Sequence, residues 1–176
     1  MKLIESKVEI IEQEPGLKGV YKQIEKASRL CYKSEDKICE GSAEKMVENL
    51  MKRGHGSPLE HGTVYLFADF YEDVGGSPLS KYENNKYSKY TWDDNGTYVT
   101  TNLRVLVENG WLDDLQYLCE PTEYHEKRIT VKMNCSIGIS REFNRHRANS
   151  VCETSTRYCN YAKDKFGNEI TFVIPE

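Results

Sequence analysis

The stretch ITVKMNCSIGISREFNRHRANSVCETSTRYCNY, residues 129–161, joins a regular hydrophobic alternation to a cluster of cations. From Ile129 to Ser140 apolar residues alternate with small or polar ones, which predicts a strand with one core face. From Arg141 to Tyr161 four arginines and one histidine stand with only two carboxylates. Guanidinium groups are rigid forks of donors that suit phosphates and carboxylates. The strand therefore leads into a predicted anion site, and a solvated face of surface ion pairs is the alternative.

The composition outside this stretch is that of an ordinary globular chain. The 176 residues are 38% hydrophobic and 30% charged, with a formal net charge of -4, which suits one domain with its own core. The acidic total disfavours a nucleic-acid binder. No apolar run approaches the roughly 20 residues that span a bilayer. Acids within the first ten residues argue against a signal peptide, so we expect a cytoplasmic protein with no membrane partner.

The six cysteines show no CxxC pair and no spacing typical of a small disulfide-bonded domain. Without a secretory signal, free thiols are expected. Cys152 lies among the arginines, which would favour its thiolate, so a nucleophilic role for it is an alternative to a plain thiol.

Periodicity predicts an α+β fold, in which a mixed or antiparallel sheet is flanked by helices. Alternation over residues 3–11 predicts a half-buried strand, and residues 63–71 carry apolar groups on both faces, as a central strand does. Helical spacing predicts helices over 17–32 and over 101–110, and another that begins with Ser42 as its N-cap and ends at Gly54.

The segment from Gly75 to Tyr98 has a different composition, dominated by Ser, Gly, Asn, Lys and Tyr. A structureless segment of this length is uncommon unless it is functional. We interpret it as a tyrosine-rich loop that acts as a lid or as an oligomer interface.

Two short motifs suggest a family. Arg145, His146 and Arg147 are followed by seven residues and then Ser155, which resembles the RHR-x7-S signature of flavin-dependent thymidylate synthases (ThyX). The segment HGSPLEH, residues 55–61, resembles that family's HxS/TPxEH segment, which also precedes a strand. The resemblance implies a single ThyX-like α+β domain over residues 1–176. The long separation of the two motifs implies an insertion, the tyrosine-rich loop and helices, at about 75–125.

The resemblance also implies an activity and a site. Members methylate dUMP to dTMP with methylenetetrahydrofolate and FADH2, NADPH re-reduces the flavin, and they assemble as homotetramers with sites between subunits. The residues implied to contact FAD are Ser57, Arg145, His146, Arg147 and Glu153. The residues implied to line dUMP are Glu142, Phe143, Asn144, Arg145, Glu153, Thr154, Ser155, Thr156 and Arg157. No residue is assigned as catalytic and no metal is expected, because the cofactors carry the bonds made and broken.

Several features depart from the family pattern or allow other interpretations. Members continue into a C-terminal segment that supplies further contacts to FAD and dUMP, whereas this sequence ends at Glu176; the alternative function is therefore a truncated, non-catalytic flavin or nucleotide binder. Glu142 replaces a common glutamine and is expected to pair with Arg141. The spacing of Ser150 and Glu153 also resembles a helix capping box.

The segment HGSPLEH also has interpretations that need no flavin. Its two histidines and Glu60 are candidates for a metal pair, although no spacing in the sequence supplies further ligands. Glu60 and His61 are also candidates for capping the end of the following strand.

Overall fold

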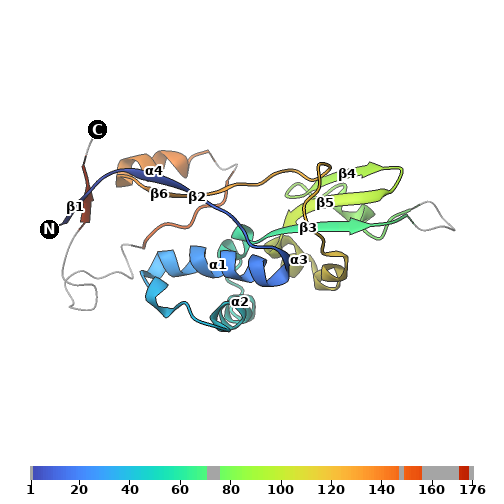
Figure 1. The fold of residues 1–176 in the computed structure, drawn as a ribbon, viewed down its shortest axis with the longest axis horizontal. Helices are drawn as coiled ribbons and strands as arrows, with labels where there is room; N and C mark the ends of the chain where they lie inside the picture. The colour runs from blue at the N-terminus through green and yellow to red at the C-terminus, as the bar shows by residue number, and fades with distance from the viewer. Residues whose placement is uncertain (1, 71–75, 147–148, 156–170, 175–176) are drawn as a thin grey trace.

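Helices and short strands mix along the chain, which confirms the predicted α+β class (Figure 1). The computed structural model describes residues 2–70, 76–146, 149–155 and 171–174. Its elements, with 3-10 helices labelled η, are β1 (Lys2–Ile4), β2 (Lys7–Ile11), α1 (Gly16–Tyr32), η1 (Glu35–Lys37), α2 (Ser42–Lys52), η2 (Ser57–His61), β3 (Thr63–Ala68), η3 (Ser80–Tyr82), β4 (Lys89–Asp93), β5 (Gly96–Asn102), α3 (Leu103–Asn109), η4 (Leu112–Tyr117), β6 (Thr130–Asn134), α4 (Ile137–Phe143) and β7 (Thr171–Val173).

The elements from α1 to η4, which we call the body, surround a three-stranded antiparallel sheet of order β3-β5-β4. All seven residues of β5 are buried, because β5 pairs with β3 on one side and with β4 on the other. The prediction that residues 63–71 form the central strand is wrong. The outer edge of β3 meets a single isolated bridge, from Leu66 to Leu118, and the amide of Cys119 donates to the Tyr65 carbonyl at 3.0 Å. Strand β3 is therefore an edge strand, and Leu118 and Cys119 cover its outer edge.

The tyrosine-rich segment is folded, so its prediction as a structureless loop is wrong. It forms η3 and then the hairpin β4–β5, whose two-residue turn is Asp94-Asn95. Gly96 closes this turn with φ +152°, and a Cβ there would lie 2.5 Å from the Ala68 carbonyl oxygen, so only glycine fits. Tyr82 and Tyr98 are buried. These two tyrosines are core residues and form no lid.

The predicted helices over 17–32 and 101–110 and the helix at Ser42 are confirmed as α1, α3 and α2. Ser42 is the first helical residue and Gly41 takes the N-cap position, because the Ser42 hydroxyl contacts the buried carboxylate of Glu25 at 2.9 Å. Arg29 completes this contact with an ion pair to Glu25, also at 2.9 Å. The buried contact fixes α2 against α1. The apolar residues that the two helices bury together are Val20, Ile24, Val47 and Leu50.

The remaining elements form an extension that we call the arm: β1, β2, β6, α4 and β7 (Figure 1). Strands β2 and β6 pair antiparallel and β1 pairs parallel with β7. Gln13 ties the base of the arm to the body, since its side-chain amide donates to the Thr63 carbonyl at 2.8 Å and accepts from the Thr63 amide at 2.9 Å. Arg128 makes a second tie, donating to the Tyr87 carbonyl at 3.0 Å.

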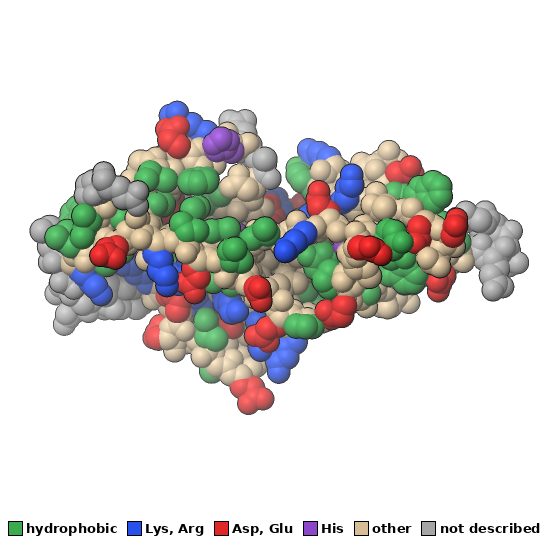
Figure 2. All heavy atoms as spheres, turned by 45° about the horizontal axis from the view of Figure 1, so that its top comes forward, with side chains coloured by type: hydrophobic (Ala, Val, Ile, Leu, Met, Phe, Trp, Pro, Cys, Tyr) green, Lys and Arg blue, Asp and Glu red, His purple; other side chains and the backbone are tan. Residues whose placement is uncertain are grey.

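The arm exposes apolar side chains that a domain core would bury. Val8 lies opposite Met133 and Ile10 opposite Val131, and all four are exposed, Ile10 to 64%. Figure 2 shows hydrophobic side chains gathered over this end of the molecule. No helix in the described part of the chain combines the length and the hydrophobicity that a membrane crossing needs. The arm therefore presents an apolar surface of the kind that marks protein interfaces.

The strand predicted over residues 129–140 is shorter than its alternation indicates. It ends at Asn134, and the helix α4 begins at Ile137. The hydroxyl of Ser136 caps that helix by accepting from the Ile139 amide, so a serine that also fits the alternation starts a helix. The chain consequently turns before it reaches the cation-rich stretch.

Candidate functional site

The segment HGSPLEH forms η2, a 3-10 turn between α2 and β3. Pro58 and Leu59 are buried and hold the turn in the body, while Ser57 is exposed. Gly62 follows η2 where it packs on α1: a Cβ there would lie 2.6 Å from Ile24 Cδ1. Packing of this closeness fixes the direction in which the polar side chains of the turn point.

Glu60 is the polar centre of this turn. Its carboxylate accepts a hydrogen bond from Arg104 Nη1 of α3 and another from the hydroxyl of Ser150. Arg104 also donates through Nε to Glu108 at 2.6 Å, and the hydrogen bonds to Glu108 and Glu60 raise the pKa of Arg104. Glu60 thus joins α3, η2 and the segment after α4. The capping interpretation of Glu60 is replaced by this three-way contact.

His61 has an unusual environment beside Glu60. Burial lowers the pKa of His61, against the opposing effect of the Glu60 charge, so the ring is neutral at pH 7. Its Nε2 atom is buried and has no hydrogen-bond partner among the described residues. A buried ring nitrogen without a partner is rare in proteins and suits a ligand contact.

The residues Glu142–His146 lie at the end of α4 and in the turn that follows, and all five are exposed. Arg145 Nη1 donates to the Glu142 carboxylate at 3.1 Å, so the expected partner of Glu142, Arg141, is replaced by Arg145. The Arg145 side chain is 77% exposed. A surface pair of this kind contributes little stability and leaves the guanidinium available to a ligand.

The segment 149–155 then packs against the C-terminal end of α1. The Ser155 amide donates to the Cys31 carbonyl at 2.9 Å, and the Thr154 hydroxyl donates to the Leu30 carbonyl at 3.4 Å. The last carbonyls of a helix lack partners within it, which is why this end of α1 accepts donors from a distant segment. The segment is thereby held near the body.

Glu153 is bound within the arm, where its carboxylate accepts from the Ser140 hydroxyl of α4 at 2.6 Å. Ser150 and Glu153 therefore have separate partners, Glu60 and Ser140, and residues 151–155 form no helix. The capping-box interpretation is wrong. Both residues instead hold the segment after α4 in place.

The thiol of Cys152, within this segment, contacts the thiol of Cys31 at the end of α1. Their mutual hydrogen bond lowers the pKa of Cys31 and, together with burial, raises the pKa of Cys152. The alternative that arginines favour a Cys152 thiolate is therefore wrong, because Cys31 is the more acidic thiol of the pair. In the described part of the chain, Cys39, Cys119, Cys135 and Cys152 form no disulfide, and Cys159 lies outside that part.

The predicted site residues fall into three groups in the structure. Ser57 and the residues Glu142–His146 are exposed, and no hydrogen bond or ion pair joins Ser57 to Arg145 or His146 among the described residues. Glu153, Thr154 and Ser155 lie in the segment held on α1. Arg147, Thr156 and Arg157 lie outside the described residues.

Sequence reasoning missed Arg104, which closes the site through Glu60, since no local pattern marks a partner 44 residues away. Within the described part of the chain, no three His, Cys, Asp or Glu side chains lie together as a metal site needs.

The structure is an α+β protein in which the segment that follows the exposed cations is joined to the polar 3-10 turn by the hydrogen bond from Ser150 to Glu60. The family model described as thymidylate synthase complementing protein matches residues 14–68 and 119–176. No curated protein and no solved structure matches the chain. The two ranges cover more than half of the sequence and include both motifs, so the chain belongs to the thymidylate synthase complementing protein (ThyX) family, as the motifs predict. The segment 69–118, which carries Arg104, lies outside the match.

Proposed function

We propose that this protein is an FAD-dependent thymidylate synthase that methylates dUMP to dTMP with methylenetetrahydrofolate and NADPH. The observation that carries the proposal is the hydrogen bond from Ser150 to Glu60. It brings the HGSPLEH turn and the segment after the RHR triplet together within one chain, although 90 residues separate them. Both motifs belong to the family match.

The donors at this place suit FAD and a nucleotide phosphate. Arg145 and His146 are exposed, and a guanidinium suits phosphate oxygens and the electron-rich edge of a flavin. The buried Nε2 of His61, which has no partner among the described residues, is a polar atom that a bound heterocycle can satisfy. When bound and reduced by NADPH, the flavin would supply the hydride, and the folate would supply the one-carbon group.

The chain's own residues orient the ligands and balance charge. Arg145 exchanges its exposed partner Glu142 for ligand oxygens, at little cost in stability. Thr154 and Ser155 are fixed by the end of α1, so their positions are set before a nucleotide arrives. Glu153 keeps α4 close to this segment through Ser140.

We propose further that the protein forms a homotetramer, in which another copy of the chain completes the site. The apolar faces of β2 and β6 are exposed in the single chain, and the arm that carries them also carries Arg145. Covering these faces with further copies removes apolar area from water and encloses the exposed cations. Thiols outside disulfides, such as Cys39, Cys119 and Cys135, suit a reducing compartment, so we place the activity in the cytoplasm.

Turnover tests this proposal. Purified protein supplied with FAD is expected to acquire a flavin absorbance spectrum and a higher melting temperature. With methylenetetrahydrofolate and NADPH it should release tritium from dUMP labelled at C5. Flavin binding without tritium release would favour the non-catalytic binder, and absence of both would reject the proposal.

A further inference from the structure

Strand β4 is the outer strand of the body sheet, and it belongs to the segment outside the family match. Among the described residues β4 pairs only with β5. Its sequence, KYTWD, contains no proline, and its pairing with β5 is continuous from Lys89 to Asp93. Two devices that protect an edge from pairing, a proline and a bulge, are therefore missing, and the single lysine of the strand, Lys89, has an acidic partner in the pairing argued below.

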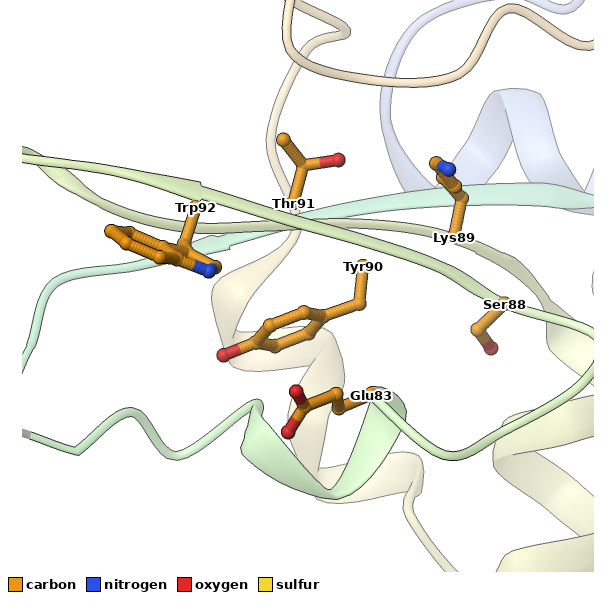
Figure 3. A pocket seen from close by; sticks show the side chains of 6 residues that line it. All are labelled: Glu83, Ser88, Lys89, Tyr90, Thr91 and Trp92. Atoms are coloured by element: carbon orange, nitrogen blue, oxygen red, sulfur yellow. The ribbon is translucent and has the colours of Figure 1, made fainter.

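The surface beside β4 is open. A hollow of about 500 Å³ lies along it, lined by Glu83, Ser88, Lys89, Tyr90, Thr91 and Trp92. Figure 3 shows Lys89 and Thr91 on one side of the strand and Tyr90 and Trp92 on the other. Trp92 is 66% exposed. Covering the Trp92 ring with another chain would remove apolar area from water.

The strand is complementary to itself when it is read in the opposite direction. With Thr91 opposite Thr91 of a second copy, Lys89 faces Asp93 of that copy and Tyr90 faces its Trp92. Opposite charges, aromatic pairs and Thr–Thr pairs are the cross-strand pairs that stabilise antiparallel sheets. The Asp93 carboxylate also accepts from the Asn95 and Gly96 amides, and its negative charge still attracts the opposing lysine.

The backbone groups agree with this register. A two-residue hairpin loop closes on a hydrogen-bonded pair, here Asp93 and Gly96. Since hydrogen-bonded and non-hydrogen-bonded pairs alternate, Thr91 turns its backbone groups toward β5, whereas Tyr90 and Trp92 turn theirs toward the free edge. The pairing centred on Thr91 sets these outward groups of the two copies opposite one another.

We propose that β4 pairs antiparallel with β4 of a second copy of this chain, centred on Thr91, to form one continuous six-stranded sheet across a two-fold axis. A contact of this kind is isologous and closes on itself. It is separate from the apolar faces of the arm and does not depend on the proposed enzymatic activity.

A disulfide trap tests both the contact and its register. Across the two-fold axis the Thr91 Cα atoms form a non-hydrogen-bonded pair about 4.5 Å apart, within the roughly 4.4–6.8 Å that a disulfide spans. Thr91→Cys should therefore give a covalent dimer under mild oxidation. Lys89→Cys is the matched control: its two copies lie about 13 Å apart at about 3.3 Å per residue, so it should cross-link no more than the wild type.

The native cysteines set the background, and peptide mapping must place the disulfide between the two introduced thiols. Equal cross-linking at positions 89 and 91, or none above the wild type, would overturn the proposal. The proposal would also fail if the thiol of the Thr91→Cys variant formed its disulfide with a different protein and not with a second copy of this chain.

A second pair of variants separates strand pairing from side-chain contact. Trp92→Pro removes an outward amide while the ladder to β5 stays intact, since proline is tolerated at a free edge. Trp92→Thr keeps that amide. Sedimentation over a wide concentration range should show that Trp92→Pro loses a self-association step that Trp92→Thr retains. Identical behaviour of these two variants and the wild type would contradict the inference even if the cysteine variant did not fold.

Discussion

The body and the arm treat hydrophobic residues in opposite ways. In the body, Leu66, Val99 and Leu106 are fully buried within one core, whereas in the arm the paired residues Val8 and Met133 remain exposed. The body has the layers that a domain needs for stability by itself. The two-stranded ribbon of the arm lacks a second layer, and an isolated ribbon is marginally stable at best. The difference teaches that the arm exposes the kind of apolar surface that the body buries, and that the candidate site lies where arm and body meet.

The largest expected difference between the two regions concerns loss of a large side chain. Leu66→Ala should lower the free energy of unfolding by about 2–5 kcal/mol, because it leaves a cavity in the core. Ile10→Ser in the arm should change the unfolding of the body by less than about 0.5 kcal/mol and should reduce the mass of the assembly. Urea unfolding and sedimentation measure the two effects. Equal destabilisation by both variants would remove the distinction between body and arm.

The joint between the regions can be loosened at a single hydrogen bond. Ser150→Ala removes the donor to Glu60, and a hydrogen bond to a charged group contributes about 1.5–3 kcal/mol. In the wild type the Ser155 amide donates to the Cys31 carbonyl. In Ser150→Ala this amide should exchange its hydrogen at least roughly tenfold faster.

The matched control is Ser34→Ala, because the Ser34 side chain makes no capping hydrogen bond. Exchange at Ser155 should be unchanged in that control. An unchanged rate in Ser150→Ala would show that this hydrogen bond does not hold the segment.

Buried histidines should make the body sensitive to acid. Burial lowers the pKa of His61 and of His125, whereas an unfolded histidine titrates near pH 6.5. Just below that pH the unfolded chain binds more protons, so stability falls as the pH falls, by at most about 1.4 kcal/mol per unit for each histidine. Melting curves of the wild type and of the double variant His61→Gln, His125→Gln measure this slope. A slope that survives in the double variant would assign it to other groups.

The smallest effect concerns the thiols of Cys31 and Cys152, where the segment 149–155 contacts α1. Since their hydrogen bond lowers the pKa of Cys31 and raises that of Cys152, alkylation of Cys31 should begin at a lower pH than alkylation of Cys152. Mass spectrometry of iodoacetamide-treated protein over a pH series resolves the two rates. The order of acidity is refuted if Cys152 reacts first.

Local patterns predicted the fold class, helices α1, α2 and α3, and the strand after HGSPLEH, because periodicity reports directly which face of an element is buried. The hairpin β4–β5 was missed. The pair Asn95-Gly96 beside β-branched and aromatic residues marks a hairpin, but it lies one residue beyond the observed turn, Asp94-Asn95, and the polar composition of residues 75–98 masked it. The alternation after Ile129 overstated the strand, because a serine compatible with a strand also caps a helix.

The two motifs predicted the family, whereas the contacts that support the two segments were not predicted. The two motifs indicate the family without any structure, because each is a local sequence pattern and the two follow in the family's order along the chain. Arg104 and the end of α1 have no local pattern that connects them to Glu60 or Ser155. Such contacts arise from the tertiary arrangement of α1, η2 and α3, which periodicity does not report.

The central proposal is that Arg145 and His146, in the turn that follows α4, bind flavin, and a change at Arg145 tests it most directly. A titration with FAD, monitored by fluorescence, compares the wild type with Arg145→Ala and with Arg141→Ala. Arg141 is another exposed arginine and lies in α4. We predict that Arg145→Ala weakens FAD binding by about tenfold or more, as loss of a charge-assisted hydrogen bond does, while Arg141→Ala changes it by less than about twofold. Equal binding by both variants, or no binding by the wild type, would contradict the account.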